Sequence, residues 1–69
     1  MDIQVGDIIY ANGYEHVVTS EPYIPNEEDL KFDSAIDENY IQGEYVIPVD
    51  SGGIIYESEI DRVCKMTKI

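Results

Sequence analysis

The sequence predicts a mainly β protein, with five short strands and one short helical turn in an excursion over residues 26–38. Three observations support this prediction. Ile and Val recur in short runs bounded by turn-forming residues, as is typical of strands. Asn12-Gly13 and Gly52-Gly53 mark two tight hairpin turns. The hydrophobic share is 43%, with six Tyr and one Phe, which is the composition of a folded chain, and 69 residues allow a single domain, 1–69.

The first strand and its return are expected near the N-terminus. Residues 3–10, IQVGDIIY, are rich in Ile and Val, and residues 13–20, GYEHVVTS, form the return strand. Ala11-Asn12-Gly13 connects them, because Asn-Gly accommodates the left-handed backbone of a two-residue hairpin loop. We therefore expect an antiparallel hairpin in this region.

Residues 21–39 break this pattern and carry much of the acidity. Pro22 and Pro25 bracket an extended piece, since each proline restricts the residue before it. Asn26 is placed to cap a helical turn, and three acids would then lie where the helix dipole favours anions: Glu27, Glu28 and Asp29. Apolar residues spaced four apart would hold the excursion against the strands: Phe32, Ile36 and Tyr40.

The second half of the sequence predicts three further strands. Residues 40–49 form a strand that Gly43 and Pro48 mark as bulged or as an edge. The remaining elements follow in order: a hairpin loop at 50–53, a strand at 54–58, a single tight turn at 58–61 and a last strand at 61–69. Tyr45 and Tyr56 flank the hairpin loop and are expected to pair across the two strands.

The charge is strongly negative and unevenly distributed. The formal net charge is −11: residues 1–61 hold all fifteen acids and one base, whereas residues 62–69 hold three bases. This excess of carboxylates argues against direct binding of nucleic acid or anionic membranes, which require Lys and Arg. It favours a basic protein as the partner, although acidity also serves solubility alone.

The remaining composition does not imply an oxidising compartment. The single Cys64 has no internal partner for a disulfide. The first residues, MDIQVGD, lack the basic and apolar regions of a signal peptide, and no apolar run is long enough to span a membrane. A cytoplasmic protein is expected.

No stretch carries a catalytic, cofactor or metal motif. His16 and Cys64 are the sole residues of their types, and their spacing does not predict a nucleophile pair. The run NEEDLKFDSAIDEN, residues 26–39, is rich in oxygen ligands but lacks the glycine and the spacing of a calcium-binding EF-hand loop. We therefore expect no enzyme, no cofactor and no specific metal site.

Two stretches carry a resemblance to a known fold. VGDIIYANGYEHVV, in which Gly-Asp precedes an apolar strand, and IIYESEIDRV, in which a strand runs into one helical turn, are similar to the opening and the ending of SH3-like small β-barrels. The resemblance implies a five-stranded SH3-like barrel with Ile60 as the plug at its end and Val63 in the closing strand. The chain has no Trp and no ALYDY-type segment, so binding of proline-rich peptides is not implied.

The carboxylates gather in two tracts. Alternate residues of a strand face one way, so Glu57, Glu59 and Asp61 would form a short row if the strand stayed extended, and folding does not explain these acids. The second tract lies on the excursion, with a tyrosine at each margin. The candidate partner-binding residues are Glu27, Glu28, Asp29, Asp33, Asp37, Glu38, Tyr23, Tyr40, Glu57 and Glu59.

Two anionic tracts on a small domain copy the charge of a nucleic-acid backbone. By type, the chain resembles phage-encoded inhibitors such as anti-CRISPR and other DNA-mimic proteins. That resemblance implies a non-enzymatic protein that blocks a basic, nucleic-acid-binding site on another protein. Two alternatives remain open. One is a Tudor-like module that reads basic peptides with Tyr23, Tyr40 and Glu44; the other is a structural subunit that assembles as a homodimer.

Overall fold

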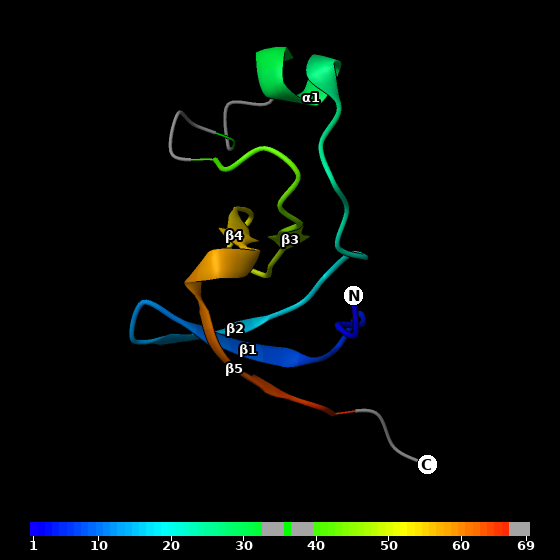
Figure 1. Cartoon of the computed structure of the whole chain (residues 1–69). Coiled ribbons are helices and arrows are strands. Elements are labelled where there is room, and N and C mark those ends of the chain that lie inside the picture. Colours follow the sequence, from blue (N-terminus) through cyan, green and yellow to red (C-terminus); the bar gives the residue numbers. More distant parts are fainter. Residues whose placement is uncertain (33–35, 37–39, 67–69) are drawn as a thin grey trace.

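The computed structural model describes residues 1–32, 36 and 40–66 (Figure 1). Five strands, one short helix and one 3-10 turn follow one another along the chain. In order they are β1 (Ile8–Ala11), β2 (Tyr14–Val17), α1 (Glu27–Phe32), β3 (Val46–Pro48), β4 (Ile54–Tyr56), η1 (Glu57–Glu59) and β5 (Ile60–Cys64). The predicted mainly β class, the five strands and the helical turn in the excursion are confirmed. The strands are shorter than predicted.

The larger sheet has three antiparallel strands in the order β2-β1-β5. β1 and β2 form the predicted hairpin, with Ala11 opposite Tyr14. Its two loop residues both have positive φ, 55° at Asn12 and 84° at Gly13. Asn and Gly tolerate this left-handed backbone, which matches the right-handed twist of the strands. The Asn-Gly signal therefore sets the register of β1 and β2.

The smaller sheet pairs β3 with β4, and Ile47 lies opposite Ile55. In the connecting loop, Val49 donates its N–H to the carbonyl of Gly53, and Gly52 donates to Val49. Val46, and not Tyr45, lies opposite Tyr56. The predicted pairing of Tyr45 with Tyr56 is therefore wrong by one residue, which places their side chains on opposite faces of the ladder.

The two sheets are not closed into a barrel, so the predicted closure is not confirmed. On one side the sheets meet at a single-residue bridge between Val18 and Val49. Pro48 has no backbone N–H to donate. It contributes to this junction only through its carbonyl, which accepts a hydrogen bond from the N–H of Thr19. On the other side, η1 turns the chain between β4 and β5, and these two strands lie in different sheets. Each junction is thus too short for a continuous ladder.

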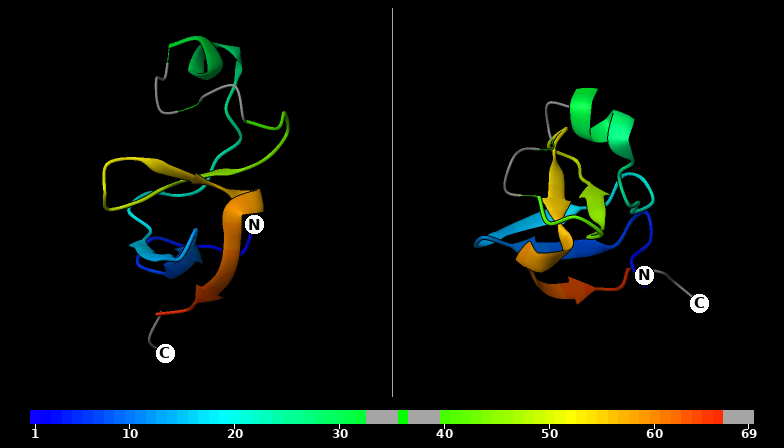
Figure 2. Two further views of the ribbon diagram at one scale, coloured as in Figure 1. Left: turned by 90° about the vertical axis from the view of Figure 1, so that its left-hand side faces the viewer. Right: turned by 45° about the horizontal axis from the view of Figure 1, so that its top comes forward.

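The core lies between the two sheets (Figure 2). It consists of buried apolar residues from both: Ile3, Ile9, Ala11, Val18, Ile47, Val49 and Ile55. Ile60 and Val63 are partly buried and pack against this cluster. Val63 lies in the last strand, β5, as expected. The predicted turn at 58–61 is η1, one residue earlier, so Ile60 already belongs to β5.

The helix α1 stands apart from this core. Figures 1 and 2 place it at one end of the molecule, with β5 at the other. Of the three residues expected to hold the excursion in place, Ile36 is buried and Tyr40 is half-buried, whereas the side chain of Phe32 lies outside the described part of the chain. The acidic first turn of α1 is therefore carried on a projection from the sheets.

Candidate acidic interaction surface

The first turn of α1 divides its three predicted acids into two roles. Asp29 and Asn26 form a reciprocal cap, in which the N–H of Asp29 donates to Asn26 Oδ1 at 2.9 Å and the N–H of Asn26 donates to Asp29 Oδ2 at 3.0 Å. This arrangement satisfies two backbone donors that a helix start leaves open. Asp29 is thus a capping residue and is half-buried.

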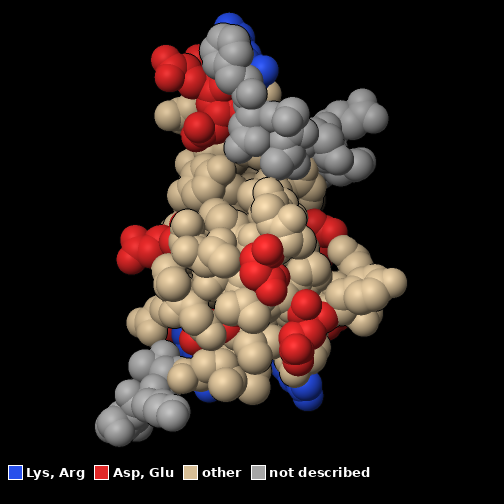
Figure 3. Space-filling model, turned by 180° about the vertical axis from the view of Figure 1, so that it is seen from behind, with Lys and Arg blue, Asp and Glu red and all other residues tan. Residues whose placement is uncertain are grey.

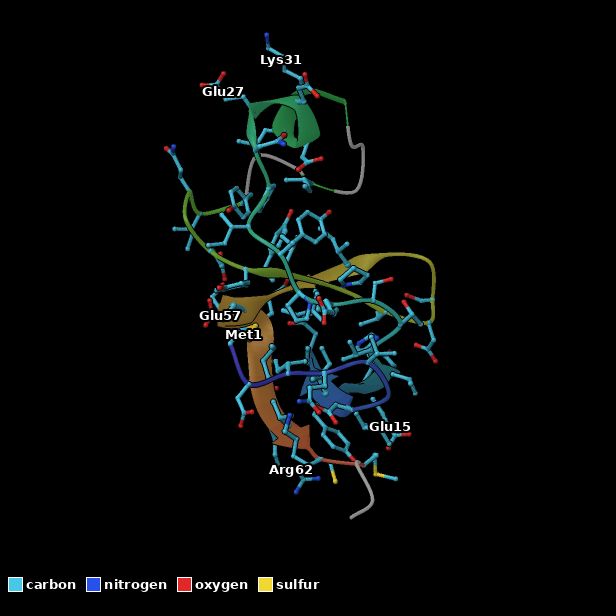
Figure 4. The ribbon with its side chains drawn as sticks, turned by 90° about the vertical axis from the view of Figure 1, so that its right-hand side faces the viewer. Met1, Glu15, Glu27, Lys31, Glu57 and Arg62 are labelled. Atoms are coloured by element: carbon cyan, nitrogen blue, oxygen red, sulfur yellow. The ribbon has the colours of Figure 1, made fainter. Side chains whose placement is uncertain are left out.

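Glu27 and Glu28 are exposed and remain available for a partner. Figure 4 shows Glu27 and Lys31 directed outward at the tip of α1. In the part of the chain that the structure describes, neither glutamate carboxylate forms an ion pair or accepts a hydrogen bond. The helix dipole stabilises both charges at this end of the helix.

Three further predicted site residues lie outside the described residues: Asp33, Asp37 and Glu38.

The two predicted contact tyrosines are both half-buried. Tyr23 forms a backbone bridge with Val46, donating its N–H at 3.1 Å and accepting at 2.8 Å. Tyr40 donates its hydroxyl to the carbonyl of Glu44 at 2.7 Å and packs edge-on against Tyr56, with ring centroids 5.8 Å apart. The two tyrosines therefore help to hold the excursion against the smaller sheet, so each has a structural role.

Glu57 and Glu59 do not form a strand row with Asp61, because η1 curls this segment out of the extended conformation. Glu59 accepts from the N–H of Tyr56 at 3.1 Å and from Asn12 Nδ2 at 2.7 Å. The expectation that folding does not explain these acids is therefore wrong for Glu59, which ties η1 to the β1–β2 turn.

Glu57 is exposed, and its carboxylate lies 3.5 Å from the N–H of Tyr45. Its own N–H donates to the carbonyl of Tyr45 at 3.0 Å. Such a long side-chain contact to an exposed carboxylate is weak. Glu57 consequently keeps its charge largely in solvent, and it is the member of this tract that fits the predicted role best.

A buried ion pair that the sequence did not reveal closes the larger sheet. Asp7 has no exposed surface, and its carboxylate accepts from Lys65 Nζ at 2.6 Å and from the N–H of Gln4 at 2.9 Å. A third donor, the N–H of Met66, lies at 3.4 Å. Lys65, and then the Gln4 N–H, hold the pKa of Asp7 below its ordinary value, against the opposing effect of burial. The pair joins residues 58 positions apart.

Glu44 is the second buried carboxylate. Its Oε1 accepts from the N–H of Ser58 in η1, and its Oε2 has no hydrogen-bond partner among residues 1–32, 36 and 40–66. Because Tyr40 donates to the carbonyl of the same residue, Glu44 links the 40–45 segment to η1. The sequence makes Glu44 a candidate peptide contact, whereas the structure places it inside the fold.

Two of the described cations are engaged within the chain. The guanidinium of Arg62 lies 4.4 Å from the centroid of the Tyr10 ring, a cation–π contact. Lys65 is held by Asp7 and lies 3.8 Å from Asp2. Figure 3 shows acids on α1 and at several separate places over the sheets, with uncharged surface between them. On this face the negative charge is therefore divided among several separate places.

The geometry gives no support to a nucleophile pair. His16 lies opposite Ile9, and Cys64 lies opposite Ile8, on the two strands that flank β1. Two strand spacings, about 9.5 Å, therefore separate them.

Within the described ranges, no three His, Cys, Asp or Glu side chains are grouped to hold a metal ion. None of the helices described there has the length and apolar character needed to cross a membrane. No protein-family model, curated protein or solved structure matches this chain.

Proposed function

We propose that this chain is a non-enzymatic acidic protein that binds a basic, nucleic-acid-binding surface of another protein and blocks it by charge mimicry. The observation that carries the proposal is the set of exposed carboxylates that the chain leaves unneutralised. Its net charge is −11, and Arg62 and Lys65 are already engaged internally. A charge of magnitude about 2 to 8 is enough for solubility in a small domain, so the excess favours a further role.

The contact surface that we propose is centred on α1, with Glu27 and Glu28 as its leading charges. The helix projects from the sheets, so its first turn can enter a concave basic site before the rest of the molecule makes contact (Figure 1). Electrostatic attraction would then speed association and make binding weaken with salt. Glu57 belongs to a second, smaller contact. Asp29 and Glu59 stabilise the fold and are not themselves part of the contact surface.

The fold that we propose for this function is an opened SH3-like barrel. The strand order β2-β1-β5, the β3-β4 hairpin and the 3-10 turn before β5 support it. By type, the closest functional analogy is to phage-encoded inhibitors of defence and nucleic-acid-processing proteins, acting in the cytoplasm. The partner is then a basic protein, and neither nucleic acid nor a membrane is bound directly.

The test is affinity purification with the full chain, followed by a salt series and competition with duplex DNA. We expect a nucleic-acid-binding protein in the eluate, displaced by DNA and by rising salt. The variant Glu27→Gln/Glu28→Gln should associate several-fold more slowly with that partner. The matched control is Glu15→Gln/Asp61→Asn, which makes the same change in net charge on the larger sheet. Equal effects of the two variants would refute α1 as the contact, and an eluate without any nucleic-acid-binding protein would refute the function.

A second candidate function is a reader of basic peptides. The edge-on pair of Tyr40 and Tyr56 beside the buried Glu44 favours it, because aromatic faces with a carboxylate attract ammonium groups. Under this proposal Tyr40→Ala and Tyr23→Ala lose binding of a lysine-rich peptide in a chain that still folds. Tyr40→Phe, which keeps the ring and removes only the hydrogen bond to the Glu44 carbonyl, retains it. Retained binding in both alanine variants would exclude it.

A further inference from the structure

A pocket lies between the N-terminal residues and the segment that joins the two sheets. Its volume is about 360 Å³. The residues that line it come from the chain before β1, from η1, from β5 and from the position after β5: Met1, Asp2, Ile3, Glu57, Val63 and Lys65. Two of them, Met1 and Glu57, are labelled at one edge of the molecule in Figure 4. Pockets that hold small ligands begin at about 300 Å³, so this one has room for a single long side chain.

Three apolar side chains form one part of the lining. Ile3 is buried in the core, and Val63 is half-buried and packs against it, so both are held in place by the fold. Met1 is exposed, and its unbranched side chain can adapt to what it contacts. An aliphatic group that enters the pocket is therefore removed from water against a surface that is largely pre-formed.

Two carboxylates supply the charge of the pocket. The side chain of Asp2 is 98% exposed, and Glu57 is exposed with its carboxylate largely in solvent. Lys65 also lines the pocket, but its Nζ lies 2.6 Å from the buried carboxylate of Asp7, which balances its charge. These four side chains together leave a net charge of −2, and an α-amino group at Met1 would reduce its magnitude to one.

The lining thus has the two features of a site for an amphipathic cation. An apolar wall suits an aliphatic stem, and exposed carboxylates suit a positive charge at the end of that stem. Lysine and arginine are such side chains, because their stems pack on apolar surface while the charged end stays near water. Anions are disfavoured by the local charge and by the net charge of −11 of the whole chain.

We propose that this pocket binds a lysine or arginine side chain of another protein. The stem lies against the apolar wall, and the cationic end lies near Asp2 and Glu57. That the other protein is the basic, nucleic-acid-binding partner rests on the proposed function, in which the pocket is the second, smaller contact to which Glu57 belongs. Figure 1 places α1 at one end of the molecule, away from η1 and β5, so such a partner presents basic side chains at two separate places.

The pocket can be tested without the partner, by nuclear magnetic resonance of the isotope-labelled full chain. The probe is Nα-acetyl-lysine amide, added at pH 7 and low salt. A single side chain binds weakly, so affinity in the millimolar range is expected. The backbone amide signals of residues 2, 3, 57, 63 and 65 should shift and saturate together. The absence of a saturable shift at these residues would overturn the proposal.

Three related compounds test which part of the probe is recognised. Nα-acetyl-norleucine amide keeps the stem without the ammonium group and should bind several-fold more weakly. Nα-acetyl-diaminopropionic amide keeps the ammonium group on a stem that is shorter by three methylenes. A fully buried methylene contributes a factor of about four, so a half-buried stem makes this compound roughly tenfold weaker. Nα-acetyl-glutamate amide should not bind. Equal affinity of any of the three with the lysine compound would refute an amphipathic cation site.

A pair of matched variants tests the carboxylates. Glu57→Gln removes one charge at the pocket and should weaken binding of the lysine compound about two- to fivefold. Glu21→Gln makes the same change of net charge at an exposed residue that does not line the pocket, and it should leave the affinity unchanged. Equal weakening by both variants would show that net charge alone attracts the probe, against the proposed site. Circular dichroism verifies that both variants remain folded.

The results separate this proposal from the proposed function. If the lysine compound binds in the pocket but affinity purification yields no nucleic-acid-binding protein, the proposed function fails and the pocket stands. If such a partner is found and depends on Glu27 and Glu28, yet the compound leaves the pocket residues unshifted, the pocket alone is refuted.

Discussion

Removal of the Lys65 cation is predicted to destabilise the fold strongly, because it leaves the buried carboxylate of Asp7 without its ion-pair partner. Lys65→Met keeps much of the aliphatic length of the side chain and deletes the Nζ that lies 2.6 Å from Asp7. Breaking a buried ion pair by removing one partner costs about 3–5 kcal/mol. The side chain of Lys65 is 39% exposed, so water partly replaces it and the lower end, about 3 kcal/mol, is expected.

That loss is large for a chain of this size. A 69-residue protein has a free energy of unfolding of about 3–10 kcal/mol. A loss of about 3 kcal/mol should lower the midpoint of thermal unfolding by roughly 12–24 °C. The measurement is urea and thermal unfolding followed by circular dichroism. Lys31→Met is the matched control, since it removes a cation from exposed α1 and should change stability by less than about 0.5 kcal/mol.

The pH dependence tests the same reasoning independently. The pKa of Asp7 is lowered in the folded protein, chiefly by Lys65, so its contribution is complete above its unfolded pKa of about 4. It is lost as the pH falls through the lowered folded pKa. In Lys65→Met the folded pKa rises, and acid unfolding should begin at a higher pH than in the wild type. Equal stability of Lys65→Met and Lys31→Met, with identical acid midpoints, would refute this account.

Three further substitutions probe the fold. Glu59→Ala removes the acceptor for the Tyr56 N–H and for Asn12 Nδ2, and should cost about 1–2 kcal/mol in urea unfolding; no change would mean that these contacts do not form in solution. Asn26→Ala removes the cap of α1 and should raise amide exchange in that helix, at a cost of about 1 kcal/mol or less; unaltered exchange would contradict the capping role. Ile47→Ala truncates a fully buried side chain and should cost about 2–5 kcal/mol in unfolding, and a cost below 1 kcal/mol would place Ile47 outside the core.

Local signals in the sequence predicted the local structure well. Asn12-Gly13 predicted a turn with two positive φ values, and the structure has both. Asn26 predicted a helix start with acids in its first turn, which α1 confirms. These predictions succeed because a turn or a cap is decided by a few neighbouring residues and by their backbone preferences.

Contacts between residues that lie far apart along the chain could not be predicted from the sequence. Gly6-Asp7 predicts the start of a strand, but nothing near it in the sequence indicates Lys65 as the partner of Asp7. Strand alternation predicts Glu59 in a row of exposed acids, and the 3-10 turn removes that alternation. Closure of the barrel failed for a related reason, since it depends on how β4 and β5 are placed, and η1 decides that.

The net charge of the chain follows directly from its sequence. Which carboxylates stay exposed and which stabilise the fold does not. The exposed acids of α1 lie on a projecting element, and Glu57 is exposed as well. Asp29 and Glu59 are committed to capping and cross-linking the fold. A count of carboxylates does not separate these two uses, because both employ the same side chain and differ only in whether a backbone donor lies within reach.

The pairing of β1 with β5 has a consequence for the order in which the larger sheet folds. β1 is complete by Ala11, but its second neighbour ends at Cys64, and the Lys65 that neutralises Asp7 follows directly. Without β5 and Lys65, β1 keeps an open edge and Asp7 keeps an unpaired carboxylate. Completion of the sheet therefore depends on closing the loop between residues 7 and 65. A chain truncated before β5 should remain unfolded, whatever the quality of its other contacts.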